Sequence, residues 1–186
     1  MNRREAVQHI SLLLGGTIVG STFFLSGCKT ETKSGKTFSG DDVVLLDEIS
    51  DTILPPTKTP GAKAAGVGKF MTVMVNDCYD EQDQTIFHEG MNKLNDAADK
   101  KYNTSFLKLN PQQRNEFLVS LDKEQQEYMK NKKKEDRSHY FRMMKELTLL
   151  GYFTSEIGCN QAMRYIETPG RYDGCVPYAK GDKAWA

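Results

Sequence analysis

The chain has 186 residues, and its 25 lysines and arginines balance 25 aspartates and glutamates, so the formal net charge at pH 7 is zero. This length suits a single domain of ordinary size once any targeting segment is set aside. The lack of a basic excess argues against nucleic acid as a partner.

Residues 1–27 have the pattern of an export signal. Arg3 and Arg4 precede an apolar run from Ile10 to Leu25. This run is too short, and too rich in small residues, for a membrane-spanning helix. The paired arginines favour the twin-arginine route, with an ordinary Sec signal as the alternative.

The apolar run ends in Leu25-Ser26-Gly27-Cys28, which resembles the lipobox of bacterial lipoproteins. We therefore expect residues 1–27 to be cleaved and Cys28 to be lipidated, which anchors the protein to a membrane. Lys29 follows the cysteine, where an aspartate would favour inner-membrane retention, so we expect the outer membrane and a position facing the periplasm. A plain export signal with an incidental cysteine is the alternative.

Residues 28–40 are small, polar and charged, which predicts a flexible tether. Residues 41–186 then read as one all-α domain of five to six helices with an irregular C-terminal tail. Apolar residues recur at spacings of three and four, and no alternating run is long enough for a sheet. The predicted helices are Ser39–Leu54, Val67–Cys78, Gln84–Lys101, one capped by Asn110 that runs through Leu121, and one from about Arg137 to Tyr152.

Two details of these helices carry further predictions. Cys78 lies on the apolar stripe of its helix, so we expect it in the core. Four lysines within Lys130–Lys134 are neutralised by nearby acids, which are Glu124, Glu127, Glu135 and Asp136. They indicate a solvated helix face or loop rather than a patch for nucleic acid or lipid headgroups.

No motif for catalysis, a metal or a cofactor stands out in the mature chain. His88 and His139 lack the spacing of a zinc site, and the glycines before Lys69 are out of register for a phosphate loop. Dinucleotide, haem and nucleophile-elbow motifs are also missing. We expect no catalytic, cofactor-binding or metal-binding residues here. Ser155, Glu156 and His139 form the one polar set that a stand-alone enzyme could use.

Three cysteines remain after Cys28, in a compartment where disulfides persist. Cys159 and Cys175 flank a turn at Pro169-Gly170 and are expected to pair, which would close the loop between them. Two free thiols, or a bond that involves Cys78, are the alternatives.

Two segments near the ends of the domain carry a family resemblance. The first is Ile53–Ala62, followed by Gly66, Val67 and Phe70. The second is Gly151–Gly158, followed by Tyr165, Pro169, Gly170 and Tyr172. Together they resemble the end motifs of the gluconate 2-dehydrogenase subunit 3 family. The likeness spans the mature domain, although residues 79–138 match only as a pattern of helices.

The resemblance implies a non-catalytic small subunit of a periplasmic, membrane-associated dehydrogenase for gluconate or another sugar. The large subunit, of the glucose-methanol-choline type, holds FAD and performs the oxidation, often with a cytochrome c subunit. The small subunit supports its folding, export or anchoring. The residues expected at the partner interface are Pro55, Pro60, Gly61, Tyr152, Ser155, Gly158, Tyr165, Pro169, Gly170 and Tyr172.

Tyrosines supply large amphipathic contact areas at interfaces, which favours this use of the tail. Closure of the chain's own core is the alternative use of the same residues. A periplasmic ligand-binding or scaffold lipoprotein without a dehydrogenase partner is the alternative function.

Overall fold

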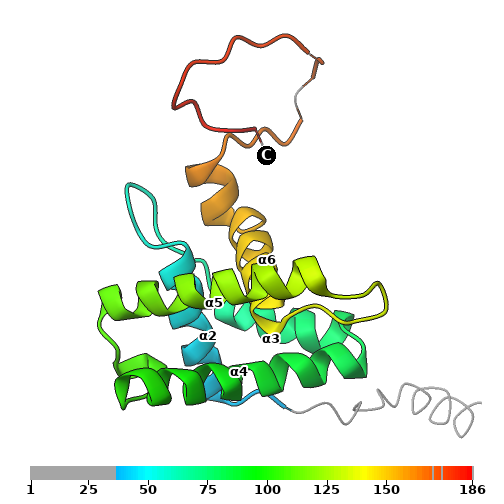
Figure 1. Ribbon diagram of the computed structural model, residues 1–186. Coiled ribbons are helices and arrows are strands. Elements are labelled where there is room, and N and C mark those ends of the chain that lie inside the picture. The colour runs from blue at the N-terminus through cyan, green and yellow to red at the C-terminus, as the bar shows by residue number, and fades with distance from the viewer. Residues whose placement is uncertain (1–36, 169, 173, 186) are drawn as a thin grey trace, which may run out of the picture. The chain divides into compact units, whose positions relative to one another are not determined.

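The computed structural model describes residues 37–168, 170–172 and 174–185 (Figure 1). The expected signal, the lipidation site Cys28, most of the tether and Pro169 lie outside the described residues. In the described part the elements are α2 (Gly40–Ile53), α3 (Val67–Cys78), α4 (Glu81–Tyr102), the 3₁₀ turn η1 (Phe106–Lys108), α5 (Pro111–Asn131), α6 (Tyr140–Phe153) and the π-helical turn η2 (Gly158–Ala162).

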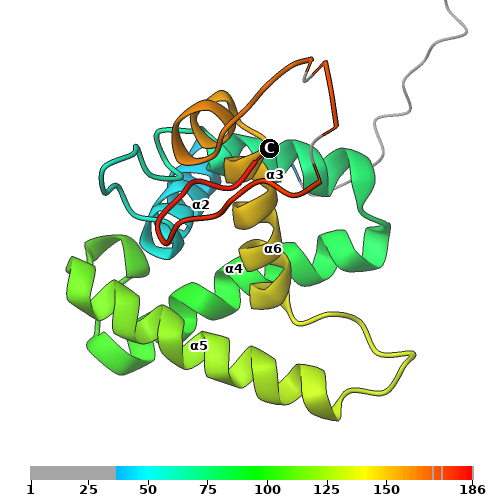
Figure 2. The same ribbon diagram turned by 90° about the horizontal axis from the view of Figure 1, so that it is seen from above.

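The predicted all-α class is confirmed, because the described residues contain helices and no strand. Helix α6 lies at the centre of the arrangement and packs against α2, α3, α4 and α5 (Figure 2). Its buried face carries Phe141, Met144 and Leu147. Helices of this length are stabilised mainly by such packing of an apolar face. Within the described range, none of the helices has the length and hydropathy to cross a bilayer.

Local capping signals define where two of the helices start. Ser39 and Asp42 form a reciprocal capping box at the start of α2. Asn110 and Gln113 form another at the start of α5, with Pro111 in the first turn. Both arrangements satisfy backbone N–H groups that a helix leaves unpaired. The predicted starts of these helices are therefore confirmed.

The predicted core position of Cys78 is wrong. Cys78 is exposed, whereas Met71 and Val75 on the same stripe are buried. Helix α3 ends at Cys78, and the chain turns there into α4. The thiol Sγ instead lies 3.9 Å from Sδ of Met74. An apolar stripe predicts burial only as far as a neighbouring element covers it.

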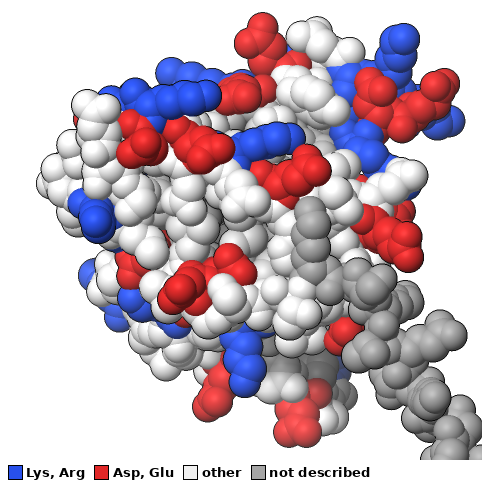
Figure 3. Space-filling model, turned by 90° about the horizontal axis from the view of Figure 1, so that it is seen from below, with Lys and Arg blue, Asp and Glu red and all other residues white. Residues whose placement is uncertain are grey.

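Charged side chains of both signs are interspersed over the face seen from below in Figure 3. The lysine-rich segment begins in the last turn of α5 and continues in the loop that follows. In that loop Lys133 N donates to Asp136 Oδ2 at 2.8 Å, and Lys132 Nζ donates to the Asp136 carbonyl oxygen at 2.8 Å. The prediction that this lysine-rich segment is a solvated helix face or loop is therefore confirmed.

Candidate partner-binding surface

The two family-like segments meet at one end of the domain. The loop between α2 and α3 reaches the last turn of α6, where Tyr152 is buried. The Tyr152 hydroxyl donates to the Pro60 carbonyl oxygen at 2.9 Å and lies 3.4 Å from Oγ1 of Thr59. A buried hydroxyl needs such a partner, so this contact couples two segments that are 92 residues apart.

Three acids on one side of α2, here called the acidic clamp, hold the following loop and the first turn of α3 in place. Asp51 Oδ1 accepts from the backbone N of Lys63 at 3.2 Å, and Asp47 Oδ1 accepts from the backbone N of Gly68 at 2.9 Å. Glu48 lies between them and pairs with the ammonium group of Lys63. The sequence signal for these contacts is three acids within five residues, followed ten residues later by a segment with glycines at positions 61, 66 and 68.

Two carboxylates of the acidic clamp have pKa values that are shifted in opposite directions. The hydrogen bond from Lys63 is the main cause that lowers the pKa of Glu48. Partial burial of Glu48 acts in the opposite direction, and the charge and hydrogen bond of Arg114 lower the pKa further. Burial raises the pKa of Asp47, although the Gly68 N–H bond opposes this shift. Ionised carboxylates accept stronger hydrogen bonds, which suits them to hold backbone N–H groups.

Several of the expected interface residues are packed inside this chain. A Cβ on Gly61 would overlap the carboxylate of Asp51 and lie 2.8 Å from the Pro56 nitrogen. Gly158 is buried against the last turn of α6. Ser155 Oγ donates to the Tyr152 carbonyl oxygen at 2.7 Å and accepts from the Gly158 N–H at 3.0 Å. Gly61, Ser155 and Gly158 therefore make contacts within this chain. That they also contact a partner stays a prediction.

The other expected interface residues differ in exposure. Pro55 is exposed in the loop after α2, and Pro60 is half-buried below it. Tyr165, Gly170 and Tyr172 are exposed in the C-terminal tail, where Tyr172 retains 97% of its accessible surface. Large apolar or aromatic side chains that stand this far out of a fold mark interaction sites when they cluster.

Residues 164–185 are here called the C-terminal arm, and the two ends of this arm, at Arg164 and at Ala184 and Trp185, lie together (Figure 1). The backbone N of Arg164 donates to the Ala184 carbonyl oxygen at 2.8 Å. The Arg164 guanidinium lies 4.3 Å from the ring centroid of Trp185, a cation–π contact. Lys183 Nζ also donates to the Gln161 carbonyl oxygen. No local sequence pattern predicts this contact, because Arg164 and Trp185 are some 20 residues apart.

The cysteines of the described chain are free thiols, so the expected Cys159–Cys175 bond is not formed in the structure. The thiol of Cys159 lies 3.1 Å from the Phe153 carbonyl oxygen, and Cys175 is exposed on the C-terminal arm. The arm is closed by the Arg164 contacts instead. The disulfide stays a prediction for the protein in its oxidising compartment.

The polar set considered for a stand-alone enzyme is not assembled. His139 caps the start of α6, where its Nδ1 accepts from the Phe141 N–H at 3.2 Å. Ser155 and Glu156 follow the other end of the same helix, which at 1.5 Å per residue puts them about 20 Å away. Among the described residues no group of three or more acids, histidines and cysteines is placed to hold a metal ion.

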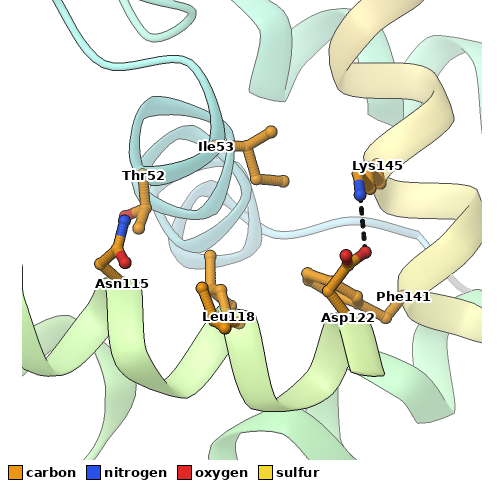
Figure 4. Close-up of a pocket in the computed structure, with 8 residues that line it drawn as sticks. Thr52, Ile53, Asn115, Leu118, Asp122, Phe141 and Lys145 are labelled. Carbon is orange, nitrogen blue, oxygen red and sulfur yellow. Dashed lines mark hydrogen bonds and ion pairs between the residues drawn. The ribbon is translucent and has the colours of Figure 1, made fainter. Parts of the chain in front are cut away.

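A hollow of about 200 Å³ lies between α2, α5 and α6 (Figure 4). Ile53, Leu118 and Phe141 line it, and at its edge Lys145 Nζ lies 2.6 Å from Asp122 Oδ1. Ligand pockets typically measure about 300 to 1,000 Å³, so this hollow is below the usual size. Its charged groups are already paired with each other.

These features define a helical domain whose two family-like segments are joined at one end and continue into a projecting arm. The family model described as gluconate 2-dehydrogenase subunit 3 matches residues 41–170. The chain therefore belongs to the gluconate 2-dehydrogenase subunit 3 family, and the family's name implies a subunit of a multi-subunit dehydrogenase. No curated protein and no solved structure matches the chain.

Proposed function

We propose that this chain is the non-catalytic small subunit of a flavin-dependent sugar or gluconate dehydrogenase. The large subunit, of the glucose-methanol-choline type, would hold FAD and oxidise the substrate, in a complex of the kind that often includes a cytochrome c subunit. The small subunit would support folding, export or anchoring of the large one. The family match over residues 41–170, which includes both joined segments, is the observation that carries this proposal.

The geometry supports a binding role over a chemical one. The polar residues at the junction of the two segments satisfy one another, as Tyr152 does with Pro60 and Ser155 does with Gly158. The same contacts hold the loop and the helix end in a fixed arrangement, which is what a preformed interface requires.

Affinity purification of the tagged chain from gently solubilised native membranes tests the proposal. We expect a yellow complex with a flavin absorbance spectrum and dye-linked dehydrogenase activity, and mass spectrometry should identify a large flavoprotein in it. An identically tagged, unrelated lipoprotein from the same cells is the control. A colourless preparation that contains only this chain would contradict the proposal.

We further propose that the mature chain is anchored through lipidated Cys28 and faces the periplasm, on the outer membrane. Labelling cells with radioactive palmitate tests this directly. Cys28→Ser is expected to lose the label, whereas the control Cys78→Ser keeps it. A label that persists on the Cys28→Ser variant would contradict the lipidation site.

The export route is proposed to be twin-arginine translocation. Replacing Arg3 and Arg4 by lysine is expected to leave the precursor in the cytoplasm, because that route reads the arginine pair. Unchanged export of this double variant would instead indicate the Sec route.

A further inference from the structure

We propose that the C-terminal arm is a preformed docking element that places its tyrosines in apolar depressions of the dehydrogenase subunit. The inference rests on the proposed function and adds which surface makes the contact. Tyr172 and Tyr178 keep 97% and 75% of their accessible surface, and Tyr165, Ile166 and Val176 of the same arm are also exposed. Aromatic side chains are the residues most enriched where interfaces gain their energy.

The arm has a defined shape before any partner arrives. Its two ends are joined by the backbone hydrogen bond from Arg164 to Ala184 and by the stacking of Arg164 on Trp185. Within the arm, the backbone N of Ala179 donates to Asp182 Oδ2 at 2.9 Å, and the backbone N of Asp182 donates to the Ala179 carbonyl oxygen at 3.0 Å. A loop closed in this way loses less conformational freedom on binding than an open tail, so more of the contact energy appears as affinity.

Exposed apolar side chains are also present on the helix that leads into the arm. Leu150 and Phe153, in the last turns of α6, keep 46% and 38% of their accessible surface. Figures 1 and 2 both show the chain passing from this end of α6 into the arm. The apolar end of α6 is therefore included with the aromatic arm in the proposed contact area.

The small net charge of the arm favours a protein over an anionic lipid surface as its binding partner. Residues 164–185 hold four basic groups and three acidic ones, so the arm has a net charge of 4 − 3 = +1. Attraction to anionic lipid headgroups requires a cluster of about four to eight lysines and arginines without such compensation. A nearly neutral arm rich in tyrosine matches the apolar centre and polar rim of protein interfaces instead.

The position of the arm relative to the family match assigns it a role in partner choice. The match ends at residue 170, just before Tyr172 of the second family-like segment, and Tyr178 and Trp185 lie further along the chain, outside the matched residues. The matched region supplies the joined loop and helix end. The outer part of the arm, with Tyr178 and Trp185, would then add contacts beyond the matched region, and such additional contacts can select one dehydrogenase subunit over another.

Photo-crosslinking in the native membrane tests the contact. The full chain is expressed with p-benzoylphenylalanine in place of Tyr172 or, separately, Tyr178. The control carries it in place of Tyr128, an aromatic side chain on α5 that is 41% exposed. Irradiation is expected to join positions 172 and 178, but not 128, to the flavoprotein. Adducts between two copies of this chain, or adducts with lipid alone, would overturn the inference.

The closure of the arm is tested with Trp185→Ala, and Trp185→Phe is the matched control because it keeps an aromatic ring for Arg164. A cation–π contact at an exposed site corresponds to about a two- to fivefold change in an equilibrium constant, so Trp185→Ala should weaken flavoprotein association by about that factor. The control should stay near the parent. Because Trp185 lies outside the buried core, the thermal midpoint of both variants should be unchanged.

The two proposals fail in different ways. If no flavoprotein co-purifies with the parent chain, the proposed function itself is wrong. If the flavoprotein co-purifies, but positions 172 and 178 give no adduct with it and Trp185→Ala binds as well as the parent, the complex stands. In that case the arm is not its docking element.

Discussion

Replacing Gly158 by alanine tests how tightly the turn after α6 is packed. A Cβ at this position would overlap the carbonyl oxygen of Tyr152 and lie 2.7 Å from the carbonyl carbon. Both atoms belong to the backbone of α6, so no side-chain rotation relieves the overlap. The turn η2 must therefore move away from the helix end.

The size of the effect follows from what that movement breaks. Overpacking a close contact costs about 1–3 kcal/mol. The Gly158 N–H also loses its 3.0 Å bond to Ser155 Oγ, and a hydrogen bond contributes about 0.5–1.5 kcal/mol net. We expect the free energy of unfolding to fall by about 2–4 kcal/mol in total. At about 2–4 °C per kcal/mol for a chain of this size, the midpoint should drop by about 4–16 °C.

Thermal unfolding followed by circular dichroism measures this shift. The matched control is Gly40→Ala, in the first turn of α2, where an added Cβ meets no described atom within 4 Å. Alanine is favoured over glycine in a helix by up to about 1 kcal/mol, so the control should be neutral or slightly stabilised. Equal midpoints for Gly158→Ala and the parent would refute the packing of η2 against α6.

Tyr152→Phe removes the hydroxyl that donates to the Pro60 carbonyl oxygen. Urea titration should show the free energy of unfolding lowered by about 1–2 kcal/mol. An unchanged midpoint would refute the coupling of the two segments through this hydrogen bond. Burial lowers the pKa of His139 below its ordinary value of 6.5, so the unfolded chain takes up this proton more readily and stability falls as the pH drops below that value. His139→Asn, which keeps a capping acceptor, should flatten this acid loss, and an unaltered pH profile would exclude His139 as its source. Thiol labelling of denatured, unreduced protein from the periplasm should find Cys159 and Cys175 protected together, whereas reactive thiols at both positions would exclude the bond.

Helix positions were predictable because their signals are local. The capping residues Ser39 and Asn110 lie within three residues of the N–H groups they satisfy. The apolar stripes repeat within a single helix, so they appear without knowledge of neighbouring elements. The same reasoning failed at α6, which was predicted from about Arg137 but begins at Tyr140.

The start of α6 depends on contacts from far along the chain. The guanidinium of Arg137 lies 2.6 Å from Asp80 Oδ2 and 3.2 Å from Asp83 Oδ2, both at the start of α4. These contacts accompany an extended approach to the helix, and His139 then supplies the cap. A residue 57 positions away cannot be identified as a partner from the local pattern around Arg137.

The sequence by itself determined the helical class, the family and which short segments carry its motifs. Only the tertiary structure decided what the motif residues do. Tyr152 and Gly158 turn out to be buried in the joint between two segments, while Tyr172 stands free on the arm. Helix propensity and capping act over a few residues, whereas burial and side-chain pairing depend on which distant surfaces the packed helices bring together.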